Sequence, residues 1–383
     1  MFNEETKKPS PLDVIALPPL KMVLVHAKDK RVNKADLRSA IRKVSSAPVR
    51  QDEKIEVQSL IKIIDKFTKE LYNEKPMNSP ARPVDVLRLY FADAVQENIP
   101  LAPYTSARIG GTADVLVMVK STNELMGVMK VILEQGLSYT ILGGGSNVLV
   151  SDKGVRGVVV LNRAKEVRFE SGTQPTVWCE SGVIFSNLAN RCASRGLAGL
   201  EWAATVPGTI GGAVYGNAGA FDGDMSKNLI WADVLTKNGL ERYTGEQMKY
   251  AYRTSILKSR DETAIVISAM LRLKNAAQEE VSAKINEFSE RRKAKQPPGA
   301  SMGSMFKNPT GDHAGRLIEA AGLKGTRIGN AEISTQHGNF FINHNETRAE
   351  DVRALIRLAQ QAVVEKFNIK LELEVELIGE WNE

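Results

Sequence analysis

The 383-residue sequence predicts an α+β protein in which a helical N-terminal extension precedes a glycine-rich body of strands and helices. All 30 glycines lie at or after Gly110, whereas ten of the 15 prolines lie before residue 104. Predicted strands and helices follow one another in the body without a repeat of about 20–50 residues. Hydrophobic residues make up 43% and charged residues 25%, which excludes a wholly disordered chain and a polytopic membrane protein.

The N-terminal extension carries most of the positive charge. Residues 1–80 contain 16 Lys and Arg against 11 Asp and Glu, a net of +5 out of +6 for the whole chain. Apolar residues at helical spacing predict an amphipathic helix over 54–72, and a shorter helix begins near Asn33. We expect residues 1–82 to be a basic helical extension packed against the body. A module that binds another protein is the alternative, and nucleic-acid binding is disfavoured because interleaved aromatic residues are lacking.

The body begins with a helix and continues with short strands. Val84, Leu87 and Phe91 share one face of a helix predicted over 84–97. Another helix is predicted over 123–135, ended by Gly136. Period-two alternation or short apolar runs predict strands over 113–119, 139–142, 155–161, 176–179, 264–273 and 371–377.

Glycine clusters recur in the body. They are Arg108-Ile109-Gly110-Gly111, Gly143-Gly144-Gly145-Ser146-Asn147, Pro207-Gly208-Thr209-Ile210-Gly211-Gly212-Ala213 and Gly216-Asn217-Ala218-Gly219-Ala220. None has the spacing of a Rossmann or Walker loop. Glycine lets backbone N–H groups approach a phosphate closely and form an anion-binding nest. The clusters therefore favour a dinucleotide cradle, with tight turns in a β-rich domain as the alternative.

Six segments stand out along the chain: Asn98–Gly111, Leu142–Asn147, Val206–Gly212, Tyr252–Ser255, Gly303–Pro309 and Leu371–Val375. Together and in this order they resemble segments of the UDP-N-acetylenolpyruvoylglucosamine reductase family. The resemblance covers roughly residues 84–383. About 50 residues separate Arg253 from Ser304, which resembles the shorter branch of the family that lacks a tyrosine-bearing insertion.

The resemblance implies a domain plan and a chemistry. It implies an FAD-binding domain of the vanillyl-alcohol-oxidase type over residues 83–275, in two parts divided near residue 152. An α+β substrate domain over 276–383 would end in a catalytic strand. FAD would be held without a covalent bond and NADPH would be the co-substrate. The substrate would be a UDP-linked amino sugar enolpyruvate, reduced to UDP-N-acetylmuramate during peptidoglycan precursor synthesis.

Three catalytic residues follow from the resemblance. Arg253 would grip the substrate carboxylate through two hydrogen bonds, which a planar guanidinium can make. Ser304 would donate the proton to C2, a transfer that a weak acid can make only to a strongly basic carbon. Glu374 would act as an acid/base or hydrogen-bonding carboxylate. The sequence alone does not separate Glu374 from Glu372 and Glu376, because a period-two strand points all three to one face.

Binding residues also follow from the resemblance. Substrate contacts are expected from Tyr252, Arg292, Lys295, Lys307, Asn308 and His337. From the residues alone, the basic run that holds Arg292 and Lys295 equally suits a helix C-terminus. Cofactor contacts are expected from Arg108, Gly143, Gly144, Gly145, Ser146, Asn147, Pro207, Gly208, Gly211, Gly212 and Gly219.

Several other classes of function are disfavoured. Cys179 and Cys192 form neither a disulfide framework nor a metal-ligand pattern, so we expect no metal and a reducing cytoplasm. The N-terminus lacks the features of a signal peptide, and we expect no membrane partner. The alternatives are another flavin oxidoreductase of the same superfamily, acting on an alcohol or sugar acid, or a non-catalytic protein on a flavin scaffold. No His or Cys lies between residues 101 and 178 to tether a flavin covalently.

Overall fold

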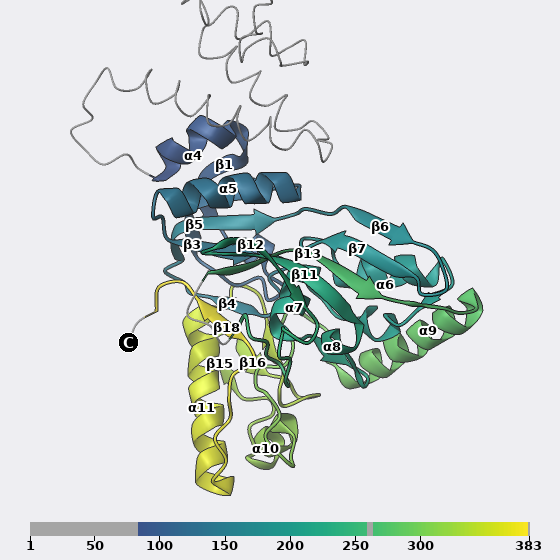
Figure 1. The fold of residues 1–383 in the computed structure, drawn as a ribbon. Coiled ribbons are helices and arrows are strands. Elements are labelled where there is room, and N and C mark those ends of the chain that lie inside the picture. The colour runs from purple at the N-terminus through teal and green to yellow at the C-terminus, as the bar shows by residue number, and fades with distance from the viewer. Residues whose placement is uncertain (1–82, 259–262, 382–383) are drawn as a thin grey trace, which may run out of the picture. The chain divides into compact units, whose positions relative to one another are not determined.

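The structure is a computed structural model that describes residues 83–258 and 263–381 (Figure 1). The helices predicted near Asn33 and over 54–72 lie outside the described residues. No helix within the described part is long and apolar enough to cross a membrane.

The first sheet has four strands in the order β1-β2-β5-β3. Strands β2, β5 and β3 run parallel, and β1 pairs antiparallel with β2. Helices α4 and α5 share an apolar core with one face of this sheet. The bounds are α4 (Pro83–Phe91), β1 (Val95–Pro100), β2 (Thr112–Val119), α5 (Thr122–Glu134), β3 (Tyr139–Leu142) and β5 (Val155–Asn162).

The helix predicted over 84–97 is too long. It ends at Phe91 and a short 3-10 turn over Ala92–Ala94 leads into β1. Val95 pairs with Val117 of β2, so the pairing of an edge strand overrides the helical spacing of the sequence. The other strands predicted before residue 274 are confirmed.

The second sheet is antiparallel, with the order β12-β11-β13-β7-β6. Its largest core includes residues of α6 and α7. The chain passes from the first sheet to the second between Asn162 and Val167. This point lies after the division expected near residue 152, because β5 still pairs with β2 of the first sheet. The bounds are β6 (Val167–Glu170), β7 (Thr176–Glu180), α6 (Phe185–Ala193), α7 (Ile210–Gly216), β11 (Leu229–Thr236), β12 (Gly239–Thr244) and β13 (Ala264–Arg272).

Helix α9 (Gln278–Lys295) packs on the second sheet's core through Phe288. The ring of Phe288 stacks on Phe221 with centroids 4.4 Å apart. The expected substrate domain begins at residue 276, yet its first helix shares a core with the preceding domain. Smaller elements nearby are β8 (Leu197–Ala198), the hairpin β9 (Gly219–Ala220) and β10 (Gly223–Asp224), α8 (Met225–Asn228), and β14 (Lys274–Asn275).

The C-terminal part has its own core, built on the three-stranded sheet β15-β16-β17 and two helices. Figure 1 shows α10 and α11 together, on the side of the sheets away from α4 and α5. Ala107, Ile109 and Leu149 of the first part also join this core. The bounds are α10 (Ala314–Ala320), β15 (Arg327–Ile328), β16 (Ala331–Ile333), β17 (Phe341–Asn343) and α11 (Ala349–Phe367).

The strand predicted over 371–377 is wrong for most of its length. Leu373 forms an isolated bridge with Phe306, the chain bends at Glu374, and only β18 (Glu376–Ile378) is a strand. It pairs in parallel with β4 (Val148–Val150). The bend arises because Glu374 bonds to two different segments: its N–H donates to the carbonyl of Met305, and its carbonyl accepts from the side chain of Asn147.

Candidate active site

Three loops pack so closely that their glycines cannot carry side chains. A Cβ atom on Gly143 would lie 2.4 Å from Oγ1 of Thr209, and one on Gly144 would lie 2.8 Å from Cα of Gly208. On Gly145, where φ is +60°, a Cβ would lie 2.2 Å from the carbonyl oxygen of Tyr104. The loops around residues 104, 143–147 and 207–209 therefore converge through their backbones.

The converging backbones present unused donors. Among the described residues, the N–H groups of Gly144, Gly145, Ser146 and Gly208 have no hydrogen-bond partner. Four neighbouring donors without partners suit an anion that accepts several hydrogen bonds, such as a diphosphate. The cradle thus fits the diphosphate of FAD.

Sequence reasoning missed Arg163, which supports the cradle. Its Nη1 donates to the carbonyl of Gly143 at 2.7 Å, and burial lowers the pKa of its guanidinium. Arg163 directly follows the last residue of β5, so this strand of the first sheet fixes the position of its backbone. A lone arginine after a buried strand gave no signal of this position.

The other residues expected at the cofactor divide into two groups. Pro207 and Arg108 are exposed in the converging loops, and a Cβ on Gly212 would meet only Oγ1 of Thr209, at 3.9 Å. Gly211 instead packs on Ser181, because a Cβ on Gly211 would lie 3.0 Å from Cβ of Ser181. Gly219 lies against Arg253 rather than within the cradle.

Arg253 occupies a tight two-residue turn closed by Ala251 and Thr254. Its φ is +56°, a left-handed conformation that few residues other than glycine adopt. The last carbonyls of α7 anchor this turn: Val214 accepts from the Tyr250 hydroxyl at 3.0 Å, and Tyr215 accepts from Ser255 Oγ at 2.6 Å. These carbonyls have no partner within the helix, so they are available to hold the loop.

Arg253 and Glu374 meet as a half-buried ion pair. Nε of Arg253 lies 2.9 Å from Oε1 of Glu374, and the two side chains are 25% and 17% exposed. The N–H of Nε is not aimed well enough for a hydrogen bond, so this buried atom lacks a partner within the described residues. This face of the guanidinium is therefore occupied by the Glu374 carboxylate through charge rather than through a well-aimed hydrogen bond.

Burial raises the pKa of Glu374 above its ordinary value of 4.5 and outweighs the lowering by Arg253, Lys258 and Lys307. The neighbouring carboxylates are more exposed, at 72% for Glu372 and 44% for Glu376, and each has its own cation: Lys307 at 3.3 Å and Lys258 at 2.5 Å. Burial and ion pairing thus distinguish Glu374 from Glu376 and Glu372, which the sequence alone does not.

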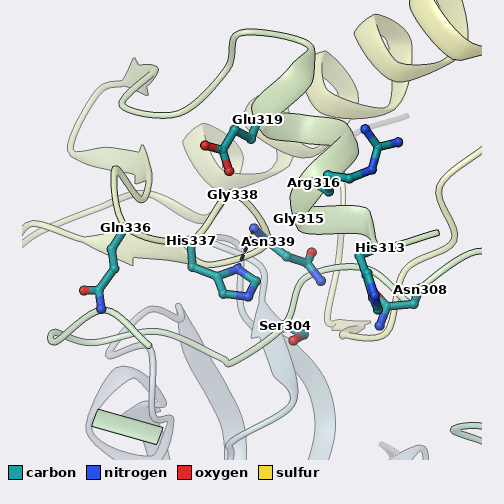
Figure 2. Close-up of a pocket in the computed structure, with 10 residues that line it drawn as sticks. All are labelled: Ser304, Asn308, His313, Gly315, Arg316, Glu319, Gln336, His337, Gly338 and Asn339. Atoms are coloured by element: carbon teal, nitrogen blue, oxygen red, sulfur yellow. Dashed lines mark hydrogen bonds between the residues drawn. The ribbon is translucent and has the colours of Figure 1, made fainter. Parts of the chain in front are cut away.

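A polar pocket of about 280 Å³ brings Ser304, Asn308 and His337 together (Figure 2). Ser304 directly precedes Met305, whose carbonyl accepts the N–H of Glu374 at 3.0 Å. Asn308 Oδ1 accepts the N–H of Ala314 at the start of α10. The pocket therefore joins the loop after α9 to the loop before β17.

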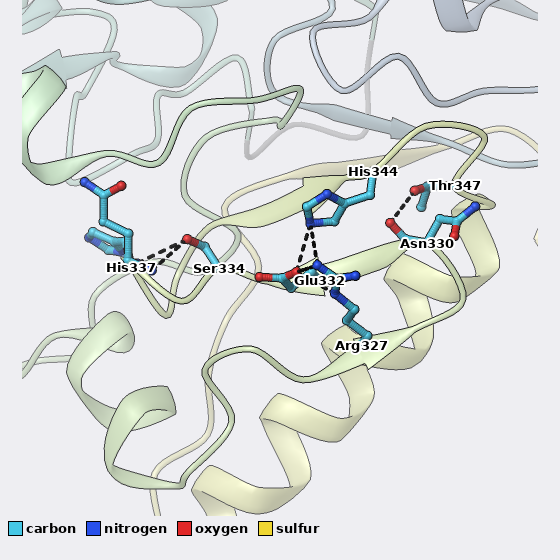
Figure 3. A network of polar contacts seen from close by, with 8 residues as sticks. Arg327, Asn330, Glu332, Ser334, His337, His344 and Thr347 are labelled. Carbon is cyan, nitrogen blue, oxygen red and sulfur yellow. Dashed lines mark hydrogen bonds and ion pairs between the residues drawn. The ribbon is translucent and has the colours of Figure 1, made fainter.

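Burial lowers the pKa of the His337 ring below its ordinary value, which favours the neutral ring. Its Nδ1 accepts the N–H of Asn339 at 3.2 Å, which leaves the ring hydrogen on Nε2. Ser334 Oγ accepts from the His337 N–H and sets this loop beside a network around Glu332, which contacts Arg327 and His344 (Figure 3).

Of the four further residues expected at the substrate, two contact residues of the site loops. The Asn308 N–H donates to the exposed Tyr252 hydroxyl at 3.5 Å, which connects the Arg253 turn to the Ser304 loop. Lys307 contacts Glu372. Arg292 Nη1 donates to Thr205 Oγ1 at 3.4 Å, two residues before Pro207 in the chain, and burial lowers the pKa of this guanidinium. Among the described residues, no side-chain contact ties the exposed Lys295 to the pocket.

A backbone cradle for a dinucleotide beside an arginine–glutamate pair defines the class of protein, a flavin-dependent oxidoreductase. Comparison with known proteins agrees. A family model described as an FAD binding domain matches residues 113–244. A second, described as the C-terminal domain of UDP-N-acetylenolpyruvoylglucosamine reductase, matches residues 294–378. The chain belongs to the UDP-N-acetylenolpyruvoylglucosamine reductase family.

Individual relatives support this membership. The reductase of that name from Bacillus licheniformis is 43% identical over 75% of this chain and 94% of its own length. The reductase of Rubrobacter xylanophilus is 42% identical over 73% of this chain and 94% of its own length. The crystal structure of the Thermus caldophilus reductase is 36% identical, with a TM-score of 0.63 over 73% of this chain and 97% of its own. An FAD-binding domain and a separate C-terminal part are thereby confirmed.

Proposed function

We propose that this protein reduces UDP-N-acetylglucosamine enolpyruvate to UDP-N-acetylmuramate with NADPH, a step of peptidoglycan precursor synthesis. The reaction consumes one NADPH and one proton and adds two hydrogens across the enol double bond. The relatives carry the name of this activity. The observation that carries the proposal is the Arg253–Glu374 pair, which lies next to the backbone of the Ser304 loop.

Bound FAD would supply the redox chemistry, taking hydride from NADPH and passing it to C3 of the enolpyruvyl group. The protein must then stabilise negative charge that develops between C2 and the carboxylate. Arg253 is the group for this task, because its guanidinium lies half-buried beside Glu374 and its charge is permanent. A cation aimed at charge that grows in the transition state lowers the barrier.

Ser304 is the proposed proton donor to C2. It lies in the polar pocket with Asn308 and the neutral His337, so the pocket can hold the substrate by hydrogen bonds beside the hydroxyl. A hydroxyl is a very weak acid, and only a carbon with carbanion character accepts its proton readily. Ser304 would therefore donate its proton to C2 only after hydride has reached C3.

Glu374 is the proposed third catalytic group. Its raised pKa brings the carboxyl closer to neutral pH, which is the range in which an acid/base group is most effective. Its contact with Arg253 supports a role beside the proposed substrate carboxylate.

The UDP moiety requires cations and amide donors. We propose Tyr252, Arg292, Lys295, Lys307, Asn308 and His337 as substrate contacts. Of these, Arg292 is supported by its half-buried position, since a buried cation gains most from an anionic partner. The proposed domain plan assigns residues 83–275 to the cofactor and residues 276–383 to the substrate.

Substrate-dependent NADPH oxidation tests the proposal. The purified protein should show a flavin absorption spectrum, and NADPH oxidation should accelerate when the enolpyruvyl substrate is added. Mass spectrometry of the product should show a gain of two hydrogens. Rapid NADPH oxidation with no dependence on this substrate, or turnover of an alcohol or sugar acid instead, would assign the chain to a different flavin oxidoreductase.

A further inference from the structure

We propose that Asn147 positions Glu374 for catalysis, and that this is its main role rather than contact with the cofactor. The inference rests on the proposed function of Glu374. Asn147 ends the loop whose Gly144, Gly145 and Ser146 offer unused N–H groups to a diphosphate. Its own polar groups instead engage the C-terminal segment.

Two hydrogen bonds join Asn147 to that segment. Its Nδ2 donates to the carbonyl of Glu374 at 3.0 Å, and its own carbonyl accepts the N–H of Glu376 at 3.0 Å. The parallel pairing of β18 with β4 begins at the next residue, where Glu376 pairs with Val148. Asn147 is therefore the point at which the bent segment becomes a strand.

The backbone of Glu374 is held on both sides. Its N–H donates to Met305 at 3.0 Å, next to Ser304, and its carbonyl accepts from Asn147. With both bonds in place the residue cannot continue the strand, and its carboxylate reaches Arg253. Loss of the Asn147 amide would free the carbonyl and let the carboxylate shift relative to the guanidinium.

This arrangement links the two ligand sites. The same loop would hold the cofactor through the backbone of residues 144–146 and the catalytic carboxylate through the side chain of Asn147. Removing the amide donor should therefore affect substrate reduction far more than cofactor affinity.

Two substitutions separate the donor from the shape of the side chain. Asn147→Ala removes the amide, and Asn147→Asp keeps the shape but replaces the donor with an acceptor that faces the Glu374 carbonyl. Asn275 is a matched control, because it is also exposed and its Nδ2 donates to a distant carbonyl, that of Gly172, at 2.9 Å. Asn275→Ala and Asn275→Asp remove that bond far from the proposed site.

In rapid-mixing experiments with the holoenzyme, both Asn147 variants should keep flavin reduction by NADPH within about 3-fold. Oxidation of the reduced flavin by the enolpyruvyl substrate should slow by about 10–100-fold, the scale of a small misplacement of a reacting group. The FAD dissociation constant should change by less than about 3-fold, and the Asn275 variants should match wild type. A large loss of FAD affinity with unchanged substrate reduction would overturn the proposal.

A double-mutant cycle tests whether the effect of Asn147 on substrate reduction is exerted through Glu374. If Asn147 acts through Glu374, Asn147→Ala should cause little further slowing in a Glu374→Gln background. Equal slowing in both backgrounds would show that Asn147 acts elsewhere and would refute the proposal. If wild type does not turn over the substrate at all, the proposed function fails first, and the two failures are thereby distinguished.

Discussion

Gly219 lies directly against the guanidinium of Arg253: a Cβ atom at position 219 would stand 3.2 Å from Nη1. The same Cβ would lie 2.8 Å from Cβ of Asp224 and 2.8 Å from the carbonyl oxygen of Gly223, across the β9–β10 hairpin. Either the hairpin or Arg253 must move to accommodate a methyl group. The sequence placed Gly219 with the cofactor, whereas its position indicates that it gives room to a proposed catalytic cation.

Gly219→Ala should therefore slow substrate reduction by about 10-fold or more, the scale of a small misplacement of a reacting group. FAD content should stay near wild type, because the residue lies outside the cradle. Gly216→Ala is the control, since no atom lies within 4 Å of its added Cβ. Steady-state rates and bound flavin per chain give the comparison. Equal loss of flavin and rate would show a general folding defect instead.

Ser304→Ala should leave FAD bound and still allow NADPH to reduce it, because that half-reaction needs no proton donor. Oxidation of the reduced flavin by the enolpyruvyl substrate should slow by at least about 100-fold, as expected for loss of a positioned acid. Rapid-mixing absorbance of the flavin measures both steps. If the two half-reactions slow equally, Ser304 is structural.

Arg253→Lys should be poorly tolerated even though it keeps the charge. An ammonium group cannot reproduce a planar two-point grip, and lysine would still have to adopt the left-handed backbone conformation at this position. We expect the loss mainly in the rate of substrate reduction, by about 10-fold or more. Turnover near that of wild type would remove Arg253 from the catalytic set.

Glu374 should make stability depend on pH in a defined direction. Its folded-state pKa is raised above 4.5, so in the window above that value the folded state holds more protons than the unfolded state. Its contribution to the free energy of unfolding therefore falls as pH rises through the window. The melting temperature of wild type minus that of Glu374→Gln should decline with pH from about 4.5 upward. A difference that grows with pH would mean that Arg253 outweighs burial.

Removal of the N-terminal extension should preserve the chemistry. A chain that begins at Arg82 keeps Val84 and Leu87 of α4, which are buried in the first core. We expect it to bind FAD and to turn over within a few-fold of full length. The melting temperature of the shortened chain, compared with that of full length, measures what the extension contributes to stability, at ~1.5–3 kcal/mol for each large side chain that it buries. Purification without flavin would place the extension within the catalytic body.

The sequence predicted β2, β3, β5, β7 and β13, because their period-two patterns or apolar runs are local features, but it did not predict β6, β11 and β12 of the second sheet. The helix predicted through 95–97 and the strand predicted over 371–375 were wrong, because contacts with distant segments determine the backbone conformation there. Val95 pairs with Val117, and Glu374 bonds to Met305 and Asn147. Neither partner can be inferred from a single segment.

The candidate site was predictable only as a set of motifs. Arg253, Ser304 and Glu374 were identified by resemblance, but their spatial relationship required the structure. Arg163 carried no motif, and its contact with Gly143 depends on the order of strands in the first sheet. Glu374 differs from Glu372 and Glu376 in burial, which period-two patterning cannot express.

The pairing of the C-terminal strand β18 with β4 has a consequence for synthesis of the protein. Strands β1 to β13 and the cradle loops all precede Glu374 along the chain, so they leave the ribosome before it does. The Arg253–Glu374 pair can therefore close only after residues 374–378 have been synthesised and have docked beside β4, so it cannot form before the segments that build the cradle exist.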